Sequence, residues 1–407
     1  MNRPAKPKSA PTLTAPAGVA GPARWALAPL YAAGFTTAFG AHSIAAGLGA
    51  ESGGIGLGLL TFGILLALYD VAEVILKPIF GSLSDRIGAK PVIVAGLAAF
   101  TLASLVGTLG TTPLILGLAR LGQGAAASAF SPASSAAVAR LAGPAVGSYF
   151  GKYGSWKSMG YVLGPLLGAA LIWVGGFPAL FLAMAIVAAA AAVWTWIAMP
   201  DLPVLPRPRY TVADLVRQST ERSFLVPTLA LAAATSALGV AVGFLPLLGT
   251  ELRMPVGASM AVVAILALSS SLTQPLAGRL RDRGQISSRS GIGWGLALVV
   301  VGVATLALVP TPFTLYVSAV VIGCGIGITT PLGFAHLAAT TPPERIGRTM
   351  GSAELGREAG DAGGPLIVGV IASSVSLAAG LGTLAFLIAA IAVVCVAFLG
   401  HGTRPRT

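Results

Sequence analysis

The chain has 407 residues, of which 55% are apolar and only 9% are charged. Soluble domains carry roughly 25% charged residues, so this composition cannot cover a water-facing surface and excludes an ordinary soluble protein. The net charge of +12 does not require a nucleic-acid partner, because the cations gather in alternate loops between apolar runs.

Apolar runs long enough to cross a bilayer as helices recur along the whole chain. In the first part of the sequence they occupy residues 26–48, 55–79, 91–109, 112–136, 153–175 and 177–199. After a polar stretch they resume at 224–248, 257–279, 290–310, 312–337, 350–375 and 377–399. This pattern predicts an all-α integral membrane protein with twelve transmembrane helices.

Polar segments divide the chain into five parts. Residues 1–23 are rich in Pro and Ala and are expected to form a disordered cytoplasmic tail. We expect a six-helix bundle at 24–199, a cytoplasmic linker at 200–223, a second six-helix bundle at 224–400 and a cytoplasmic tail at 401–407. A cleaved signal peptide is not expected, because no apolar region precedes the Ala-rich stretch of the tail.

Loop charges predict the orientation. If the N-terminus is cytoplasmic, nearly all loop Lys and Arg residues fall on the inner side, and the outer loops hold only Arg253. Positive residues accumulate on the cytoplasmic side of membrane proteins. We therefore expect a multi-pass protein of the bacterial cytoplasmic (inner) membrane with both termini in the cytoplasm.

An internal repeat relates the two halves. The segment 81–86, Gly-Ser-Leu-Ser-Asp-Arg, recurs at 278–283 as Gly-Arg-Leu-Arg-Asp-Arg. The segment 160–166, with the pattern Gly-x-x-x-Gly-Pro-Leu, recurs at 360–366. Both landmarks repeat in the same order after about 200 residues, which indicates a duplication and predicts two pseudo-symmetric six-helix bundles.

The loop after the second span resembles the signature loop of the major facilitator superfamily. The residues that carry this resemblance are Gly81, Asp85, Arg86, Gly88 and Lys90, although Ala89 stands where a basic residue is common. The resemblance covers nearly the whole chain and implies a secondary transporter, usually a monomer, with Asp85 and Arg86 latching the two halves near the start of the eleventh helix. The second loop copy is degenerate after Arg283, so Asp282 is expected to matter less.

Two further motifs refine the resemblance. Arg120, followed by Gln123 and Gly124, is similar to the arginine motif in the fourth helix of that family. The fifth span is similar to the motif of its drug:proton antiporter branch, except at Ala169, where a second glycine is usual. The matching residues are Gly160, Gly164, Pro165 and Gly168. The three glycines form one small-residue face that permits close helix packing, and Pro165 is expected to bend the helix.

Ionisable residues inside a membrane are costly and mark functional sites. Asp70, Glu73 and Lys77 fall on one face of the second span, whereas the corresponding positions of the second half are uncharged. Two neighbouring carboxyl groups disfavour double ionisation, so one of them is suited to load and release a proton. The alternative is a structural Glu73–Lys77 pair, with Asp70 hydrogen-bonded to a neighbouring helix.

Other charged residues lie on the fourth and eleventh spans. Arg120 has no cation opposite it in the second half and can hold a carboxylate ionised, while Asp361 is the deepest acid of the eleventh span. Glu354 and Glu358 are expected at a solvated cytoplasmic helix end. His42 is expected to be a packed or water-facing residue rather than a titrating one.

These features favour a proton-coupled antiporter that exports a small drug-like or toxic compound by alternating access. The alternative is a proton-coupled importer of a small metabolite on the same fold. An enzyme is not expected, because the sequence lacks HExxH, GxSxG and GxxxxGK[ST] patterns. No cofactor or metal is expected; the partners would be a small-molecule substrate, protons and the lipid bilayer, with no nucleic acid.

Overall fold

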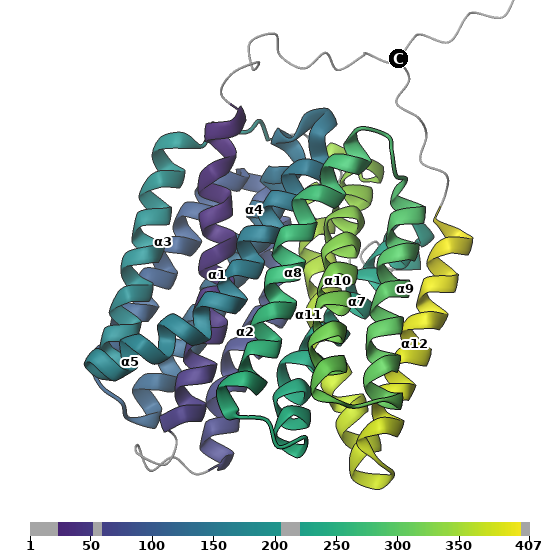
Figure 1. Ribbon diagram of the computed structural model, residues 1–407. Coiled ribbons are helices and arrows are strands. Elements are labelled where there is room, and N and C mark those ends of the chain that lie inside the picture. Colours follow the sequence, from purple (N-terminus) through teal and green to yellow (C-terminus); the bar gives the residue numbers. More distant parts are fainter. Residues whose placement is uncertain (1–22, 52–58, 205–219, 400–407) are drawn as a thin grey trace, which may run out of the picture.

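The expected apolar runs form helices that stand side by side (Figure 1). The computed structural model describes residues 23–51, 59–204 and 220–399. In Figure 1 the purple-to-teal helices of the first half lie on one side and the green-to-yellow helices of the second half on the other. The linker core at 205–219 and the predicted tails at 1–22 and 400–407 lie outside the described residues.

Each expected span coincides with a described helix or with part of one, except that residues 55–58 of the second span lie outside the described residues. The helices are α1 (Ala23–Glu51), α2 (Leu59–Ile87), α3 (Ala89–Gly107), α4 (Pro113–Leu141), α5 (Val146–Ala198), α7 (Arg222–Glu251), α8 (Val256–Asp282), α9 (Ser288–Leu308), α10 (Pro312–Thr340), α11 (Ile346–Ser374) and α12 (Leu377–Phe398). Within the described residues, seven of these elements are long and apolar enough to cross a membrane. The protein is therefore an all-helical, multi-pass membrane protein.

Helix α5 contains two of the expected spans. Its backbone stays helical through Pro165 and departs from helical geometry at Gly175 and Gly176. Gly176 has φ 68°, a left-handed conformation that glycine adopts without a Cβ clash. The boundary expected between spans 153–175 and 177–199 thus lies at this glycine pair.

Helix ends follow from local sequence. Ser287 and Ser290 form a reciprocal capping box at the start of α9, and Thr311 and Thr314 form another at the start of α10. These side chains satisfy N–H groups that have no partner inside the helix. Polar caps therefore place the two helix starts where the sequence turns from loop to apolar run.

The glycine face of α5 packs against α1. A Cβ at Gly160 would lie 2.7 Å from the Ala38 Cβ, and one at Gly168 would lie 2.8 Å from the Ser43 carbonyl oxygen. Side chains at these positions would push the helices apart, because backbone atoms cannot yield as a flexible side chain does. The close packing expected of this motif is present.

At one end of the molecule the two halves meet through Asp85. We call this the closed end: the end at which α2 and α8 finish and α5 and α11 begin. The Asp85 carboxylate accepts hydrogen bonds from the backbone N–H groups of Gly347 (2.8 Å) and Arg348 (2.9 Å) in the first turn of α11. A helix N-terminus favours an anion there, because its N–H groups are unpaired and its dipole is positive.

A cation from the same half of the chain lies beside Asp85. Arg140, at the end of α4, donates to the Asp85 carboxylate at 3.1 Å. Arg86 is exposed, and the described part of the chain offers it no ion pair. The expected contact between Asp85 and the start of α11 is therefore present, whereas the described residues show no ion pair through which Arg86 would take part in the latch.

Asp282 makes the same kind of contact in the second half. Its carboxylate accepts hydrogen bonds from the backbone N–H groups of Gly147 (2.8 Å) and Ser148 (2.5 Å), at the start of α5. Arg281 lies 3.3 Å from the same carboxylate. The degenerate loop copy thus retains the one carboxylate that a helix N-terminus can bind, and the structure gives no reason for Asp282 to matter less than Asp85.

Glycines let the backbones touch at the closed end. A Cβ at Gly278 would lie 2.0 Å from the Gly147 carbonyl oxygen, and one at Gly81 would lie 2.7 Å from that of Gly347. Both pairs join the two halves of the chain. The duplicated motif therefore combines a close backbone approach with a carboxylate that binds the facing helix start.

Replacing Asp85 or Asp282 by Asn removes a charge that caps a helix N-terminus. We expect each variant to favour opening of the closed end by roughly 1 kcal/mol, or about fivefold. A thiol at Ser271, which is buried against α5, reports this opening. The measurement is the labelling rate of Ser271→Cys by a soluble maleimide, with Cys324 and Cys395 replaced by Ala.

The control is Asp201→Asn, which removes an equally charged but 90% exposed carboxylate. This variant should leave the labelling rate unchanged. If Asp85→Asn raises the rate and Asp282→Asn does not, the two contacts are not equivalent and only the first loop closes this end.

Candidate functional site

A polar cavity of about 150 Å³ lies between the two halves of the chain. We call it the central cavity. It receives side chains from α1, α2, α4, α5 and α11, including four acids and three bases. Its lining comprises Thr37, Ala38, Ala41, His42, Asp70, Glu73, Arg120, Lys157, Tyr161, Arg357, Glu358 and Asp361.

Buried ion pairs join the halves beside this cavity. Lys77 of α2 donates to Glu358 of α11 at 3.0 Å, and Lys157 of α5 donates to Glu354 of α11 at 3.1 Å. Lys77 also lies 2.8 Å from Glu73, an ionic contact without hydrogen-bond geometry. Lys77 and Glu354 are each 0% exposed, so these charges depend on one another for compensation.

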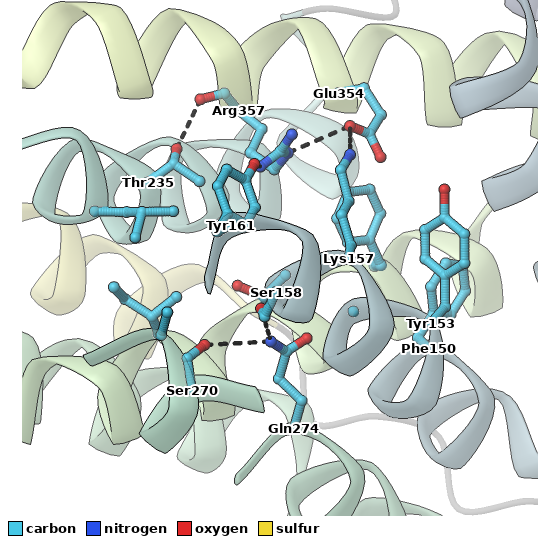
Figure 2. A pocket seen from close by; sticks show the side chains of 16 residues that line it. Phe150, Tyr153, Lys157, Ser158, Tyr161, Thr235, Ser270, Gln274, Glu354 and Arg357 are labelled. Atoms are coloured by element: carbon cyan, nitrogen blue, oxygen red, sulfur yellow. Dashed lines mark hydrogen bonds and ion pairs between the residues drawn. The ribbon is translucent and has the colours of Figure 1, made fainter. Parts of the chain in front are cut away.

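Arg357 completes the charge network, which we define as Glu73, Lys77, Lys157, Glu354, Arg357 and Glu358. Its guanidinium contacts Glu354 at 3.3 Å and pairs with Glu358. It also donates to the Tyr161 hydroxyl at 3.3 Å, as Figure 2 shows beside the Lys157–Glu354 pair. The network contains three acids and three bases, so the six charges balance.

The expectation that Glu354 and Glu358 lie at a solvated helix end is wrong. Glu354 is fully buried, and Ser135 of α4 donates to its second oxygen at 3.2 Å. The first turns of α11 contact α2, α4 and α5 of the other half through Asp85, Ser135 and Lys157. A clue in the sequence was the repeat itself, which places Lys157 and Arg357 at matching positions with Glu354 one helical turn away.

Two carboxyl groups of the central cavity stand apart from the charge network. Asp70 of α2 is exposed, and Asp361 of α11 is half-buried. Neither has an ion pair or hydrogen bond with the described residues, whereas Glu73, Glu354 and Glu358 each contact a Lys or Arg. The sequence singled out Asp70, Glu73 and Asp361 together, and the structure separates Glu73 from the other two.

Arg120 is the one base of the cavity outside the charge network. Its side chain is 2% exposed, and its guanidinium lies 4.3 Å from the centre of the Tyr69 ring. It donates to the Gly40 carbonyl oxygen at a long 3.3 Å, and its Nε has no partner among the described residues. The structure therefore places an undercompensated cation in the cavity wall.

His42 also lines the cavity. Its Nδ1 lies 3.0 Å from the Ala38 carbonyl oxygen, and its ring packs edge-on against Tyr161 at 4.2 Å between centroids. This agrees with the expectation of a packed histidine. Together, His42 and Tyr161 give the cavity an aromatic part of its wall.

A second, smaller cavity of about 40 Å³ shares Lys157, Tyr161 and Arg357 with the central cavity. Figure 2 shows the side chains that line it. Its wall includes Phe150 of α5, whose ring stacks on Phe334 of α10 with centroids 5.6 Å apart. Gln274 donates to Ser158 at 2.7 Å and to Ser270 at 3.2 Å. This space is mainly apolar, unlike the charged central cavity.

The remaining motif residues do not reach either cavity. Gly88 begins α3 with φ 97°, and Lys90 lies 3.5 Å from Asp201 near the closed end. The helix-5 glycines face α1 rather than the cavity. Within the described ranges, no group of His, Cys, Asp and Glu could hold a metal ion.

Comparisons with known proteins agree with this architecture. The model of the Major Facilitator Superfamily matches residues 17–283 and 228–407. The chain is also similar to the human organic anion transporter MFSD10 (TETRAN), with a TM-score of 0.79 and 17% identity over 92% of this chain and 100% of that one. At that identity the likeness concerns the fold.

Curated relatives match over shorter stretches. The multidrug resistance protein MdtG of Erwinia billingiae is 33% identical over 138 residues, or 34% of each chain. MdtG of Escherichia coli K12 is 34% identical over 135 residues, or 33% of each. A Mycolicibacterium smegmatis protein named as a triacylglyceride transporter is 36% identical over 107 residues, 26% of this chain and 19% of that protein. The matches span about a third or less of these relatives.

The family model matches both halves of the chain, and the helices, the duplicated loop motif and the charged cavity between the halves are consistent with that match. The chain belongs to the major facilitator superfamily of membrane transporters.

Proposed function

We propose that this transporter is a proton-coupled antiporter that exports a small drug-like or toxic compound by alternating access. The observation that carries this proposal is the division of the carboxyl groups around the central cavity. Three form ion pairs with Lys or Arg, and two, Asp70 and Asp361, have no cation of the described residues within ion-pair distance. The similarity to proteins named as multidrug resistance proteins supports export as the direction.

An unpaired carboxylate within the membrane is suited to exchange a proton for a substrate. A charge near the bilayer centre costs roughly 2.5–3.5 kcal/mol on insertion scales, and protonation removes this cost. Glu73, Glu354 and Glu358 are poor proton carriers by comparison, because adjacent ammonium or guanidinium groups stabilise their ionised forms. We therefore assign the proton first to Asp70, then to Asp361, and last to Glu73.

Alternating access would require the cross-half contacts to open. When the halves separate, Lys77 would remain paired with Glu73 in the first half. Arg357 would remain paired with Glu354 and Glu358 in the second half. Lys157 pairs with Glu354, which belongs to the other half, so it would lose that partner. The aspartate contacts at the closed end would open in the same transition, which supports a rocking motion of two six-helix bundles.

The twelve-helix arrangement and its orientation form part of the proposal. Bundles at 24–199 and 224–400 would flank a cytoplasmic linker at 200–223, with the closed end facing the cytoplasm of a bacterium. The loop cations support this orientation. No contact with another copy of the chain is needed to build the central cavity, which supports a monomer.

Fusion reporters test the topology. A reporter fused after Thr407 should be active on the cytoplasmic side, and one inserted at residue 52 should report the outer side, because the loop cations favour the inner face. The measurement is a paired fluorescence and phosphatase assay in intact cells. A cytoplasmic signal at residue 52 would contradict the span count and the orientation.

Export itself is tested by a susceptibility screen. A deletion strain should become more sensitive, and an overexpressing strain more resistant, to at least one toxic compound in a broad panel. That compound should accumulate in inverted membrane vesicles when a pH gradient is imposed and should release protons from them. Uptake into whole cells instead would favour the importer of a metabolite.

Amide substitution of the unpaired acids tests the coupling. We expect Asp70→Asn to abolish substrate accumulation driven by a pH gradient while substrate binding persists, because the amide resembles the protonated acid. Asp361→Asn should have the next largest effect, and Glu73→Gln the smallest. The measurement is accumulation in inverted vesicles, compared with exchange of substrate in the absence of a gradient.

Asp201→Asn serves as the matched control, because it removes an exposed carboxylate near the closed end. It should leave accumulation unchanged. If all three cavity variants pump normally against a proton gradient, the proposed coupling is wrong, and the driving ion must be sought elsewhere.

A further inference from the structure

We infer that the central cavity binds a small zwitterion, whose anionic group contacts Arg120 and whose cationic group contacts Asp361. This inference rests on the proposed function, because it names the chemical class of the exported substrate. It starts from the two charges of opposite sign that the cavity leaves without an ionic partner.

Arg120 provides the site for the anion. The side chain is 2% exposed, yet the described residues supply no carboxylate within ion-pair distance. Its partners are the Tyr69 ring and one long hydrogen bond to the Gly40 carbonyl oxygen. A guanidinium offers five N–H donors in a planar fork that matches a carboxylate or a phosphonate, and most of this capacity is unused here.

Asp361 provides the site for the cation. It belongs to α11 and hence to the half of the chain opposite Arg120 on α4. Arg357 and Glu358, on the preceding turn of the same helix, pair with each other, and Arg357 forms no ion pair with Asp361. An ammonium group of a ligand would supply the missing charge.

The two halves also contribute net charges of opposite sign to the cavity and the charge network. The first half contributes Asp70, Glu73, Lys77, Arg120 and Lys157 to the cavity and the charge network, with one excess positive charge when all are ionised. The second half contributes three acids and Arg357, with two excess negative charges. A zwitterion lying across the interface would meet each half with the opposite charge.

Singly charged ligands fit this arrangement less well. A cation would compensate Asp361 and leave Arg120 without a partner, while an anion would do the reverse. A buried charge without compensation is strongly unfavourable, so a ligand carrying both groups should be preferred over its singly charged analogues. Asp70 then remains available for the proton.

Volume limits the group that joins the two charges. An engineered cavity of about 150 Å³ in another protein holds one benzene molecule, and the central cavity has a similar volume of about 150 Å³. The wall formed by His42 and Tyr161 offers aromatic surface to such a ring. The group that joins the acid and the amine is therefore limited to about the size of one ring, and the two charged ends must lie in the cavity wall beside Arg120 and Asp361.

The test compares matched benzene derivatives for binding to the purified full-length protein in lipid nanodiscs by calorimetry. The probes are 4-(aminomethyl)benzoate and its 3-isomer as zwitterions, benzylamine as the cation and benzoate as the anion. We expect at least one zwitterion to bind about tenfold or more tightly than both benzylamine and benzoate. Equal or weaker binding of both zwitterions would overturn the inference.

Variants identify the two contacts. Arg120→Gln should reduce binding of the preferred zwitterion to about the level of benzylamine and leave benzylamine binding unchanged. Asp361→Asn should reduce binding of the zwitterion and of benzylamine together. Arg253→Gln, which removes an exposed guanidinium outside the cavity, is the control and should change neither. Unchanged zwitterion binding by Arg120→Gln would remove Arg120 from the site.

Folding and transport are controlled separately. If Arg120→Gln does not purify as a monodisperse protein, Arg120→Lys keeps the charge and should still weaken the zwitterion more than benzylamine, because it lacks the planar fork. Failure of the zwitterion preference alone, with Asp70→Asn still abolishing proton-driven export of a screened compound, refutes only the substrate class. Normal pumping by all three amide variants refutes the proposed function instead.

Discussion

Buried ion pairs between the two halves determine how the helices around the central cavity are arranged. Lys77, Lys157, Glu354 and Arg357 are buried at the interface, Glu358 is partly buried there, and each of the five pairs with a neighbour of opposite charge. A buried charge without a partner strongly destabilises the folded state, so the helices that carry these residues must stay in register. The register of α2 and α5 against α11 then fixes the walls of the central cavity.

The duplicated loop motif has a physical basis that the two halves share. Each copy supplies an aspartate to the N-terminus of a helix in the other half, and each supplies a glycine that lets the backbones approach. Loss of the later residues in the second copy is tolerated, because neither contact uses them. The two contacts close the same end of the molecule by the same interaction.

Ion pairing also distinguishes the charged residues that hold the two halves together from those available to bind a proton or a substrate. The six charges of the charge network balance one another, whereas Asp70, Asp361 and Arg120 have no ionic partner among the described residues. In our proposal Asp70 binds the proton, and Asp361 and Arg120 bind the substrate. The same cavity would then serve coupling and recognition, which is what an exchange of proton for substrate requires.

Several features followed from the sequence alone, because they depend on local properties of the chain. Hydropathy placed the helices, the repeat related the halves, and the loop motif predicted the contact of Asp85 with the start of α11. The sequence also singled out Asp70, Arg120 and Asp361. It offered the Glu73–Lys77 pair as one of two alternatives, and the structure contains that pair. It could not show that Glu354 is buried or that Arg140 pairs with Asp85. Those outcomes depend on which helices face one another across the interface, and only the tertiary structure decides that.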